Sequence, residues 1–300
     1  MIRAVRSLAM LVVACVASLL VAAECQRPAQ PAVGGGPSTG WEGGVNTGGE
    51  ALVPPPHPPS SKVCRWVPSG RAVRRGQARV VGGSPSALGA YPWTCSVETA
   101  DGAHYCGATV VRPMAALCAA HCQVQPGDVL HCGTVDLTHP GQRIRIAEPR
   151  NNPTWSGVGT MGDVAVLMLE SSTTMPPVEL SDRDVHADYP IALVAIGWGA
   201  IREGGPVTPI QQHVTLPLVP WDECDREFEH RLTGDMLCAG GIPGQDACQG
   251  DSGGPLVVQT GSGWAQVGIV SWGHGCARDL PGVYTSVYQW RDWILACSEP

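Results

Sequence analysis

Short apolar runs separated by Gly, Pro, Asn and Asp recur along the chain after residue 80. Runs of this length with turn-forming residues between them are typical of β-strands. The six clearest runs are Ala108–Val111, Ile144–Ile146, Val164–Leu169, Ile191–Ile196, Leu256–Val258 and Val267–Trp272. Many short strands over this stretch predict one all-β domain, built as a barrel or a sandwich.

Two segments show helical spacing instead, Trp221–Leu232 and Tyr288–Cys297. In the second, the apolar residues from Trp290 onward fall three and four positions apart, which places them on one face of a helix. We therefore expect a short helix at the C-terminal end of the domain.

The N-terminus has the features of a secretory signal peptide. Arg3 and Arg6 precede an apolar run, Leu8–Ala23, that ends in small residues. This pattern predicts residues 1–23 as a signal peptide and the mature protein as secreted and extracellular. No later run is long enough for a stable membrane span. A lipid-modified Cys15 is the alternative, but it would leave a very short apolar region.

Residues 24–79 differ in composition from the rest of the chain. Clusters of glycine and the run Pro54–Pro59 cannot sustain a helix or a central strand, so we expect a flexible arm. The arm has one Lys and six Arg against three Glu, a net charge of +4, whereas residues 80–300 have ten Arg and 23 acidic residues, a net charge of -13. The arm could dock on the acidic domain or act as a solvated linker.

Composition narrows the class of protein. Thirteen cysteines indicate an oxidising compartment, because cytosolic thiols are kept reduced. A hydrophobic content of 44% argues against a wholly disordered chain, and a formal charge of -7 argues against a nucleic-acid-binding protein. Nothing in the sequence indicates an oligomer, so we expect a monomer.

A glycine-rich segment, Gly250–Pro255, contains a candidate nucleophile, Ser252. Glycines on both sides let a carbonyl approach the hydroxyl closely and leave backbone N–H groups free to face a developing oxyanion. An ordinary glycine-rich turn is the plainer interpretation. An α/β-hydrolase would need an acid and a histidine after the serine. Only His274 follows, with no acidic residue between, which argues against that class.

A general base must then come from earlier in the chain. His121 follows an apolar run, and Cys106 lies upstream of Cys122 where a disulfide would fix the histidine loop. Asp163 stands before the run Val164–Leu169. Taken singly, the histidine would be a surface residue and the aspartate a turn residue.

Together, His121, Asp163 and Ser252, in this order and each in its own local motif, resemble the chymotrypsin-like, trypsin-fold serine peptidases. The resemblance runs from Val80 almost to the C-terminus. It implies two six-stranded antiparallel Greek-key barrels with the active site between them, and a short C-terminal helix.

In that family the serine attacks the scissile carbonyl, the histidine takes and returns the proton, and the aspartate orients the imidazole. The resemblance assigns these roles to Ser252, His121 and Asp163. It places the oxyanion hole at the N–H groups of Gly250 and Ser252, and it makes Ser271 the residue that supports the buried aspartate.

The resemblance also implies a zymogen. Arg79–Val80 looks like an activation site, and residues 24–79 would then be a propeptide. Cleavage would free the α-amino group of Val80 to pair with the carboxylate of Asp251, ordering the oxyanion hole and the pocket. A surface Arg before a glycine turn is the plain alternative.

The substrate-binding residues implied by the resemblance are Asp246, Ala247, Ser271, Trp272, Gly273 and Gly282. An anionic floor at Asp246 between the open walls of Gly273 and Gly282 admits a long cationic side chain. Ala247 lacks a hydroxyl that an ammonium needs more than a guanidinium does, so we expect cleavage after Arg in preference to Lys.

The family pattern implies three disulfides, Cys106–Cys122, Cys224–Cys238 and Cys248–Cys276. Pairing of the other six cysteines of the secreted chain stays open: Cys25, Cys64, Cys95, Cys118, Cys132 and Cys297. Cys95 with Cys132 is a candidate bridge between neighbouring strands, and Cys64 is a candidate to hold the arm after activation.

We expect no cofactor and no metal. The acidic pair that binds calcium in some relatives has no match in residues 134–143. A zinc site from Cys118, His121, Cys122, His131 and Cys132 is an alternative, although the spacing is crowded for a tetrahedral site.

The sequence therefore predicts a secreted serine endopeptidase, activated by cleavage, that hydrolyses peptide bonds after Arg and less well after Lys. Its partners would be protein or peptide substrates and a protein inhibitor. The alternative is a catalytically silent homologue that acts as a binding protein, although all three members of the triad are present.

Overall fold

The computed structural model describes residues 64, 80–81, 83–199, 208–243, 246–247, 251–273 and 280–300, with only the backbone described for 80–81 and 246–247. All of them lie in one compact unit, Val53–Pro300. The strands are β1 (Val80–Val81), β2 (Ser84–Pro85), β3 (Thr94–Glu98), β4 (His104–Arg112), β5 (Ala115–Cys118), β6 (Val129–Cys132), β7 (Gln142–Asn151), β8 (Ala165–Leu169), β9 (Glu179–Leu180), β10 (Ala192–Gly197), β11 (Gln212–Val219), β12 (Met236–Gly240), β13 (Asp246–Ala247), β14 (Pro255–Thr260), β15 (Gly263–Trp272) and β16 (Pro281–Ser286). The helices are α1 (Trp221–Glu227) and α2 (Val287–Cys297).

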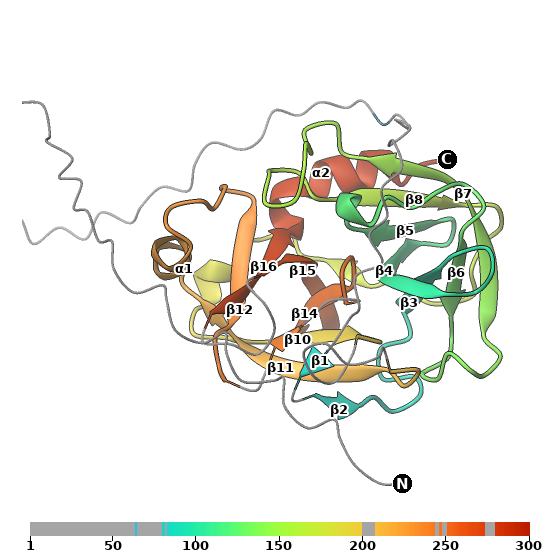
Figure 1. Cartoon of the computed structure of the whole chain (residues 1–300), viewed down its shortest axis with the longest axis horizontal. Helices are drawn as coiled ribbons and strands as arrows, with labels where there is room; N and C mark the ends of the chain where they lie inside the picture. The colour runs from blue at the N-terminus through green and yellow to red at the C-terminus, as the bar shows by residue number, and fades with distance from the viewer. Residues whose placement is uncertain are drawn as a thin grey trace, which may run out of the picture. The chain divides into compact units, whose positions relative to one another are not determined.

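The first barrel is a closed sheet in the order β3-β4-β5-β8-β7-β6, with every neighbouring pair antiparallel (Figure 1). Closure removes the unpaired edges that an open sheet would leave. Leu117, Leu130, Ile146 and Leu167 are fully buried within its core, so apolar burial holds the barrel together.

The second barrel follows the order β10-β14-β15-β16-β12-β11 and closes through the pairing of β10 with β11. Its own core contains Leu193, Leu216, Leu237 and Tyr284. The short strand β2 adds to β11, and β9 pairs in parallel with β15. Two closed, six-stranded antiparallel barrels confirm the fold class that the sequence predicted.

The six apolar runs predicted as strands fall in β4, β7, β8, β10, β14 and β15. The C-terminal helix is also confirmed as α2. It begins after Ser286, whose hydroxyl accepts a hydrogen bond from Gln289 N, and it buries Trp290, Trp293 and Ile294 in the core cluster of the first barrel.

The helix predicted over Trp221–Leu232 is shorter than expected, because α1 ends at Glu227. Glu229 and His230 have φ angles of 55° and 59°, in the left-handed region, which a continuing helix cannot accommodate. Instead, the segment after α1 folds back toward Asp225, whose Oδ1 accepts a hydrogen bond from Leu232 N.

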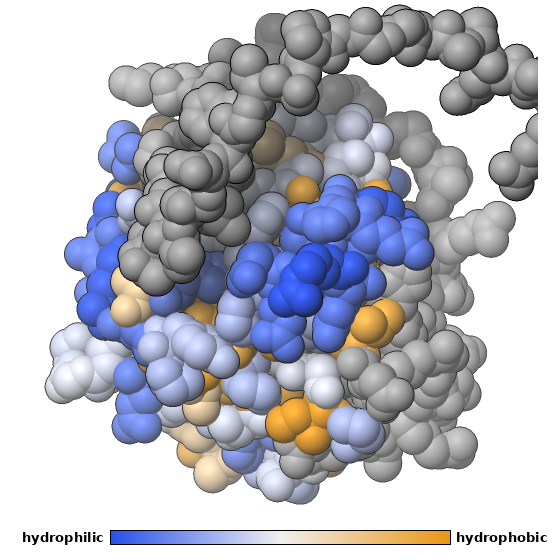
Figure 2. Space-filling model, turned by 90° about the vertical axis from the view of Figure 1, so that its left-hand side faces the viewer, coloured by the Kyte–Doolittle hydropathy of each residue, from blue (hydrophilic) through white to orange (hydrophobic). Residues whose placement is uncertain are grey.

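The face of the molecule that carries α1 is mostly hydrophilic where its residues are described (Figure 2).

Four disulfides join described cysteines: Cys64–Cys297, Cys95–Cys132, Cys106–Cys122 and Cys224–Cys238. Cys95 and Cys132 meet because β3 and β6 pair with Ser96 opposite His131, which brings the two cysteines into the next opposed position. Cys248 and Cys276, predicted to pair, lie outside the described residues. Cys118 is buried with a free thiol.

In the part of the chain that the structure describes, no helix is both long and apolar enough to cross a membrane.

Candidate active site

The pairing of β5 with β8 places His121 beside Asp163. The two strands are antiparallel and Cys118 is opposite Ala165, so the segment after β5 and the segment before β8 leave the barrel together. His121 lies in a short 3-10 turn after β5, and the Cys106–Cys122 disulfide fixes this turn to β4. The histidine loop is therefore held at the position where Asp163 precedes β8.

Asp163 receives hydrogen bonds from both barrels. His121 donates its backbone N–H to Oδ1 over 2.8 Å, and its ring Nδ1 lies 2.7 Å from Oδ2. Ser271 Oγ, on β15 of the second barrel, donates to the same Oδ2. Thr285 Oγ1, on β16, donates to the backbone carbonyl of Asp163 over 3.0 Å. The aspartate is 1% exposed, so these bonds replace the water that its carboxylate loses.

The pKa values of the pair reflect this contact. Burial would lower the pKa of the His121 ring, but the adjacent Asp163 carboxylate outweighs burial and raises it. Burial would raise the pKa of Asp163, but the charge and hydrogen bond of His121, together with the Ser271 hydroxyl, lower it. Nδ1 of His121 is thereby committed to Asp163, which leaves Nε2 as the nitrogen that can take up a proton.

The turn that contains Ser252 is packed against the first barrel. Gly107 N on β4 donates to the carbonyl of Ser252 over 2.8 Å, and Gly253 N donates to Val270 O over 2.9 Å. Gly253 has a φ of 77°, and a Cβ atom on Gly107 would lie 2.8 Å from Gly254 Cα. Glycine at these positions lets the two backbones approach each other directly.

This packing brings the serine turn to the histidine turn. Sγ of Cys122, the residue after His121, lies 3.6 Å from the carbonyl oxygen of Ser252. Among the hydrogen bonds of the described residues, none joins Ser252 Oγ to the His121 ring. Contacts of this kind often tighten only in the complex with substrate. The structure thus places His121 and Ser271 in contact with Asp163, and it places the turn of Ser252 beside the turn of His121.

Asp251, the residue before the serine, is completely buried. Its Oδ1 accepts a hydrogen bond from Gly199 N over 3.0 Å, and a Cβ atom on Gly197 would lie 2.0 Å from that oxygen. The backbone of β1 pairs with β13, with Val80 opposite Ala247 and Val81 opposite Asp246. The candidate activation segment therefore lies against the candidate pocket segment.

The structure describes some of the other residues that were predicted to form the pocket. Gly282 is buried in β16 opposite Ala239, and Gly273 is exposed at the end of β15. The half-buried Trp272 ring meets Phe228 edge to face, with centroids 5.0 Å apart. Arg79, Gly250, Cys248 and Cys276 lie outside the described residues, and so do the side chains of Val80, Asp246 and Ala247.

The structure argues against the alternative zinc site, which would be formed by Cys118, His121, Cys122, His131 and Cys132. Cys122 and Cys132 are committed to disulfides, and His131 Nδ1 lies 2.8 Å from Glu98 Oε1. Burial raises the pKa of the Cys118 thiol, which disfavours the thiolate that a metal ligand needs. In the described residues, no group of three or more metal-binding side chains comes together.

Two residues at the site were missed by the sequence analysis, Thr285 and Gly107. In the sequence, Thr285 is one of several β-branched residues in an apolar strand. Gly107 is an isolated glycine within another strand. Their roles depend on contacts across 122 and 145 residues, respectively, so no local pattern could have shown them.

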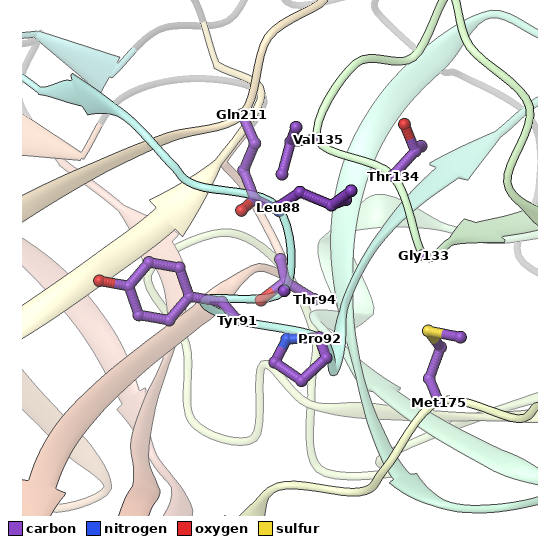
Figure 3. A pocket seen from close by; sticks show the side chains of 10 residues that line it. Leu88, Tyr91, Pro92, Thr94, Gly133, Thr134, Val135, Met175 and Gln211 are labelled. Carbon is purple, nitrogen blue, oxygen red and sulfur yellow. The ribbon is translucent and has the colours of Figure 1, made fainter.

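A cavity of about 260 Å³ lies elsewhere on the domain. Leu88, Tyr91, Pro92, Val135 and Met175 give it a largely apolar lining (Figure 3). None of the predicted site residues lines it, so it is separate from the candidate active site.

The His121–Asp163 contact predicts a raised histidine pKa. In the folded protein the pKa of His121, followed by NMR titration, should lie above the ordinary value of about 6.5. Asp163→Asn should lower it, because the substitution removes the negative charge that stabilises the imidazolium. A His121 pKa that does not respond to Asp163→Asn would contradict the assigned contact. His121→Gln identifies the resonance among those of the nine histidines.

A family model described as Trypsin matches residues 80–294. The match begins at Val80, includes all three residues of the candidate triad and covers well over half of the chain. Together with the two barrels and the hydrogen-bonded His121–Asp163 pair, it shows that the chain belongs to the trypsin family, the chymotrypsin-like serine peptidases.

Proposed function

We propose that the protein is a secreted serine endopeptidase, synthesised as a zymogen, that hydrolyses peptide bonds after Arg and less well after Lys. The observation that carries this proposal is the Asp163 carboxylate, which is buried between the barrels and bonded to His121 and Ser271. A buried carboxylate that orients a histidine next to a serine turn is the arrangement needed to activate a nucleophile.

In the proposed reaction, Ser252 Oγ attacks the scissile carbonyl while its proton passes to His121 Nε2. The imidazolium is stabilised by Asp163, and the N–H groups of Gly250 and Ser252 face the oxyanion. His121 then gives the proton to the leaving amine as the C–N bond breaks, which leaves an acyl-enzyme on Ser252. Water, deprotonated by His121, releases the acid product and restores the serine.

Cleavage after Arg79 would switch this site on. The Asp251 carboxylate is fully buried, and a positive charge brought next to a buried carboxylate would stabilise its ionised form. The new α-amino group of Val80 supplies one. Because the Val80–Val81 backbone pairs with Asp246–Ala247 in the intact chain, moving Val80 to Asp251 would free the pocket segment to rearrange.

The proposed specificity depends on Asp246 at the floor of the pocket, with Gly273 and Gly282 at its walls. A guanidinium can make two parallel hydrogen bonds to the Asp246 carboxylate, whereas an ammonium needs a further acceptor that Ala247 does not provide. Arg79 itself then fits the pocket, so the active enzyme could cleave its own zymogen.

A trypsin-family domain with several disulfides is typical of secreted or extracellular proteins. With residues 1–23 as a signal peptide, we propose that the mature protein acts outside the cell as a monomer. Its partners would be protein or peptide substrates with Arg or Lys at the cleavage site, and a protein inhibitor that occupies the same pocket.

The Cys64–Cys297 disulfide extends the proposal to the arm. Cys297 ends α2, and Arg150 Nη1 donates to the carbonyls of Cys297 and Glu299, each over 2.8 Å. Arg112 Nε donates to Ser298 Oγ over 2.8 Å. Cys64 lies in the arm, before the activation site. Cleavage at Arg79–Val80 would therefore leave the propeptide covalently attached to the firmly held end of α2.

The proposed function is tested on residues 24–300, folded with disulfides formed, beside Ser252→Ala. After limited cleavage by a trypsin-like activator, peptides that differ only in Arg, Lys or Phe before the scissile bond are compared. We expect Arg to be cleaved faster than Lys and Phe not to be cleaved, only after the new Val80 terminus appears, and none by Ser252→Ala.

Confirmed cleavage at Val80 without hydrolysis of any peptide would overturn the proposal and favour a binding homologue. A preference for Lys would contradict the role given to Asp246 and Ala247 while leaving the catalytic assignment in place.

Attachment of the arm is tested by gel electrophoresis of the cut Ser252→Ala protein, which cannot digest itself. Without reductant the cut protein should run as one covalent species, and with reductant it should separate into the arm and the domain. In the matched variant Cys64→Ser/Cys297→Ser the arm should separate without reductant. Release of the arm from the unreduced parent protein would refute the tether.

A further inference from the structure

We propose that Asp235 is a positioning residue for the catalytic aspartate: its buried carboxylate holds the Gly162–Asp163 turn in place against α2. The inference rests on the proposed function, because Asp163 is assigned its catalytic role there. Asp235 lies just before β12, 72 residues beyond Asp163 in the chain, and no motif of the sequence points to it.

Both carboxylate oxygens of Asp235 are occupied by hydrogen-bond donors. Oδ2 accepts from Gly162 N over 2.7 Å and from Trp290 Nε1 over 2.8 Å. Oδ1 accepts from Thr233 Oγ1 over 2.5 Å. The backbone carbonyl of Asp235 also accepts from Ser286 N over 2.8 Å, next to the start of α2. One side chain thus joins the turn before β8 to the C-terminal helix.

The Gly162–Asp163 turn needs an anchor of this kind. Val164 N donates to Gly162 O over 2.7 Å, so Asp163 is the middle residue of a tight three-residue turn. Gly162 has a φ of 80°, and a Cβ atom there would lie 2.2 Å from Thr154 Oγ1. The N–H of Gly162 is the first polar group of this turn, and it is bonded to Asp235. Displacing Gly162 would move the Asp163 carboxylate relative to His121.

The buried Asp235 carboxylate depends on its hydrogen-bond donors. It is 1% exposed, and among the described residues no basic group forms an ion pair with it. A buried carboxylate without a counter-charge is costly unless donors satisfy its oxygens. Three side-chain and backbone donors meet that requirement here, and one of them belongs to the catalytic turn.

Three variants distinguish the positioning role of Asp235 from an effect of its negative charge and from general destabilisation of the fold. Asp235→Ala removes the acceptor. Asp235→Asn keeps a carbonyl oxygen for Gly162 N and Trp290 Nε1 while Thr233 Oγ1 accepts from the amide, so it preserves the geometry without the charge. Asp225→Ala is the control, since Asp225 is also a buried carboxylate that accepts from a loop N–H, that of Leu232, but it does not contact the Asp163 turn.

The first measurement is the NMR titration of His121 in the full chain with Ser252→Ala, which requires no activity. Asp235→Ala should lower the pKa of His121, because the displaced Asp163 carboxylate stabilises the imidazolium less. Asp235→Asn and Asp225→Ala should leave that pKa unchanged. Where Asp235→Ala does not fold, Asp235→Ser replaces it, because a serine hydroxyl is too short to reach Gly162 N.

The second measurement is the kinetics of the activated enzymes with Ser252 intact. Asp235→Ala should lower kcat by about 10²-fold, the cost of misplacing a catalytic group by about 1 Å, with KM unchanged. Asp235→Asn should recover most of kcat. The acid limb of the pH profile should move to lower pH in Asp235→Ala, in step with the pKa of His121.

A folded Asp235→Ala with the parent pKa of His121 and the parent kcat would overturn the proposal. Equal losses of kcat in Asp225→Ala would also overturn it, because they would indicate general destabilisation. So would an Asp235→Asn variant as defective as Asp235→Ala, because the effect would then come from the charge of Asp235 and not from its position. If the parent enzyme cleaves no peptide but the His121 pKa responds as described, the proposed function fails and the positioning role stands.

Discussion

The carboxylate of Asp163 joins the two barrels at the point where the chemistry is proposed to occur. It is buried, it accepts from His121 of the first barrel and from Ser271 of the second, and its own carbonyl accepts from Thr285. Because a buried carboxylate must have its oxygens satisfied, the relative position of the barrels is tied to these bonds. A shift of one barrel against the other would break them.

Close backbone contact completes the junction. The serine turn of the second barrel bonds to Gly107 of the first, and side chains larger than hydrogen would keep Gly107 and Gly254 apart. The site is therefore built from turns and strand ends of both barrels, and neither barrel contains it alone. Because the site depends on both barrels, a residue of the second barrel that is remote in sequence, such as Asp235, can contact the turn that carries Asp163.

Local sequence patterns predicted much of this arrangement. The runs that form β4, β7, β8, β10, β14 and β15 have the length of strands and are bounded by turn-forming residues. Each member of the candidate triad stands in a recognisable motif. Other elements lack such a signal. β5 is the alanine-rich Ala115–Cys118, which has low β-propensity but is buried between β4 and β8. The spacing that suggested a longer α1 could not show that Glu229 and His230 turn into the left-handed region.

Contacts between distant segments account for what the sequence left open. Cys95 and Cys132 pair only because β3 and β6 close the first barrel, and Cys64 pairs with Cys297 across 233 residues. Thr285 and Asp235 reach the Asp163 turn from β16 and from the segment before β12. Their types are ordinary for a strand and a turn, so their importance depends on a tertiary fold that periodicity does not encode.

We propose that the two barrels together activate Ser252 once the chain is cut. This activation can be measured with a fluorophosphonate, which reacts covalently only with an activated nucleophile, added before and after cleavage at Arg79–Val80. Mass spectrometry should find one adduct, on Ser252, in the cut protein alone, and none when His121→Ala is cut in the same way. A cut protein with an intact Val80 terminus and no adduct on Ser252 would show that cleavage does not activate the serine.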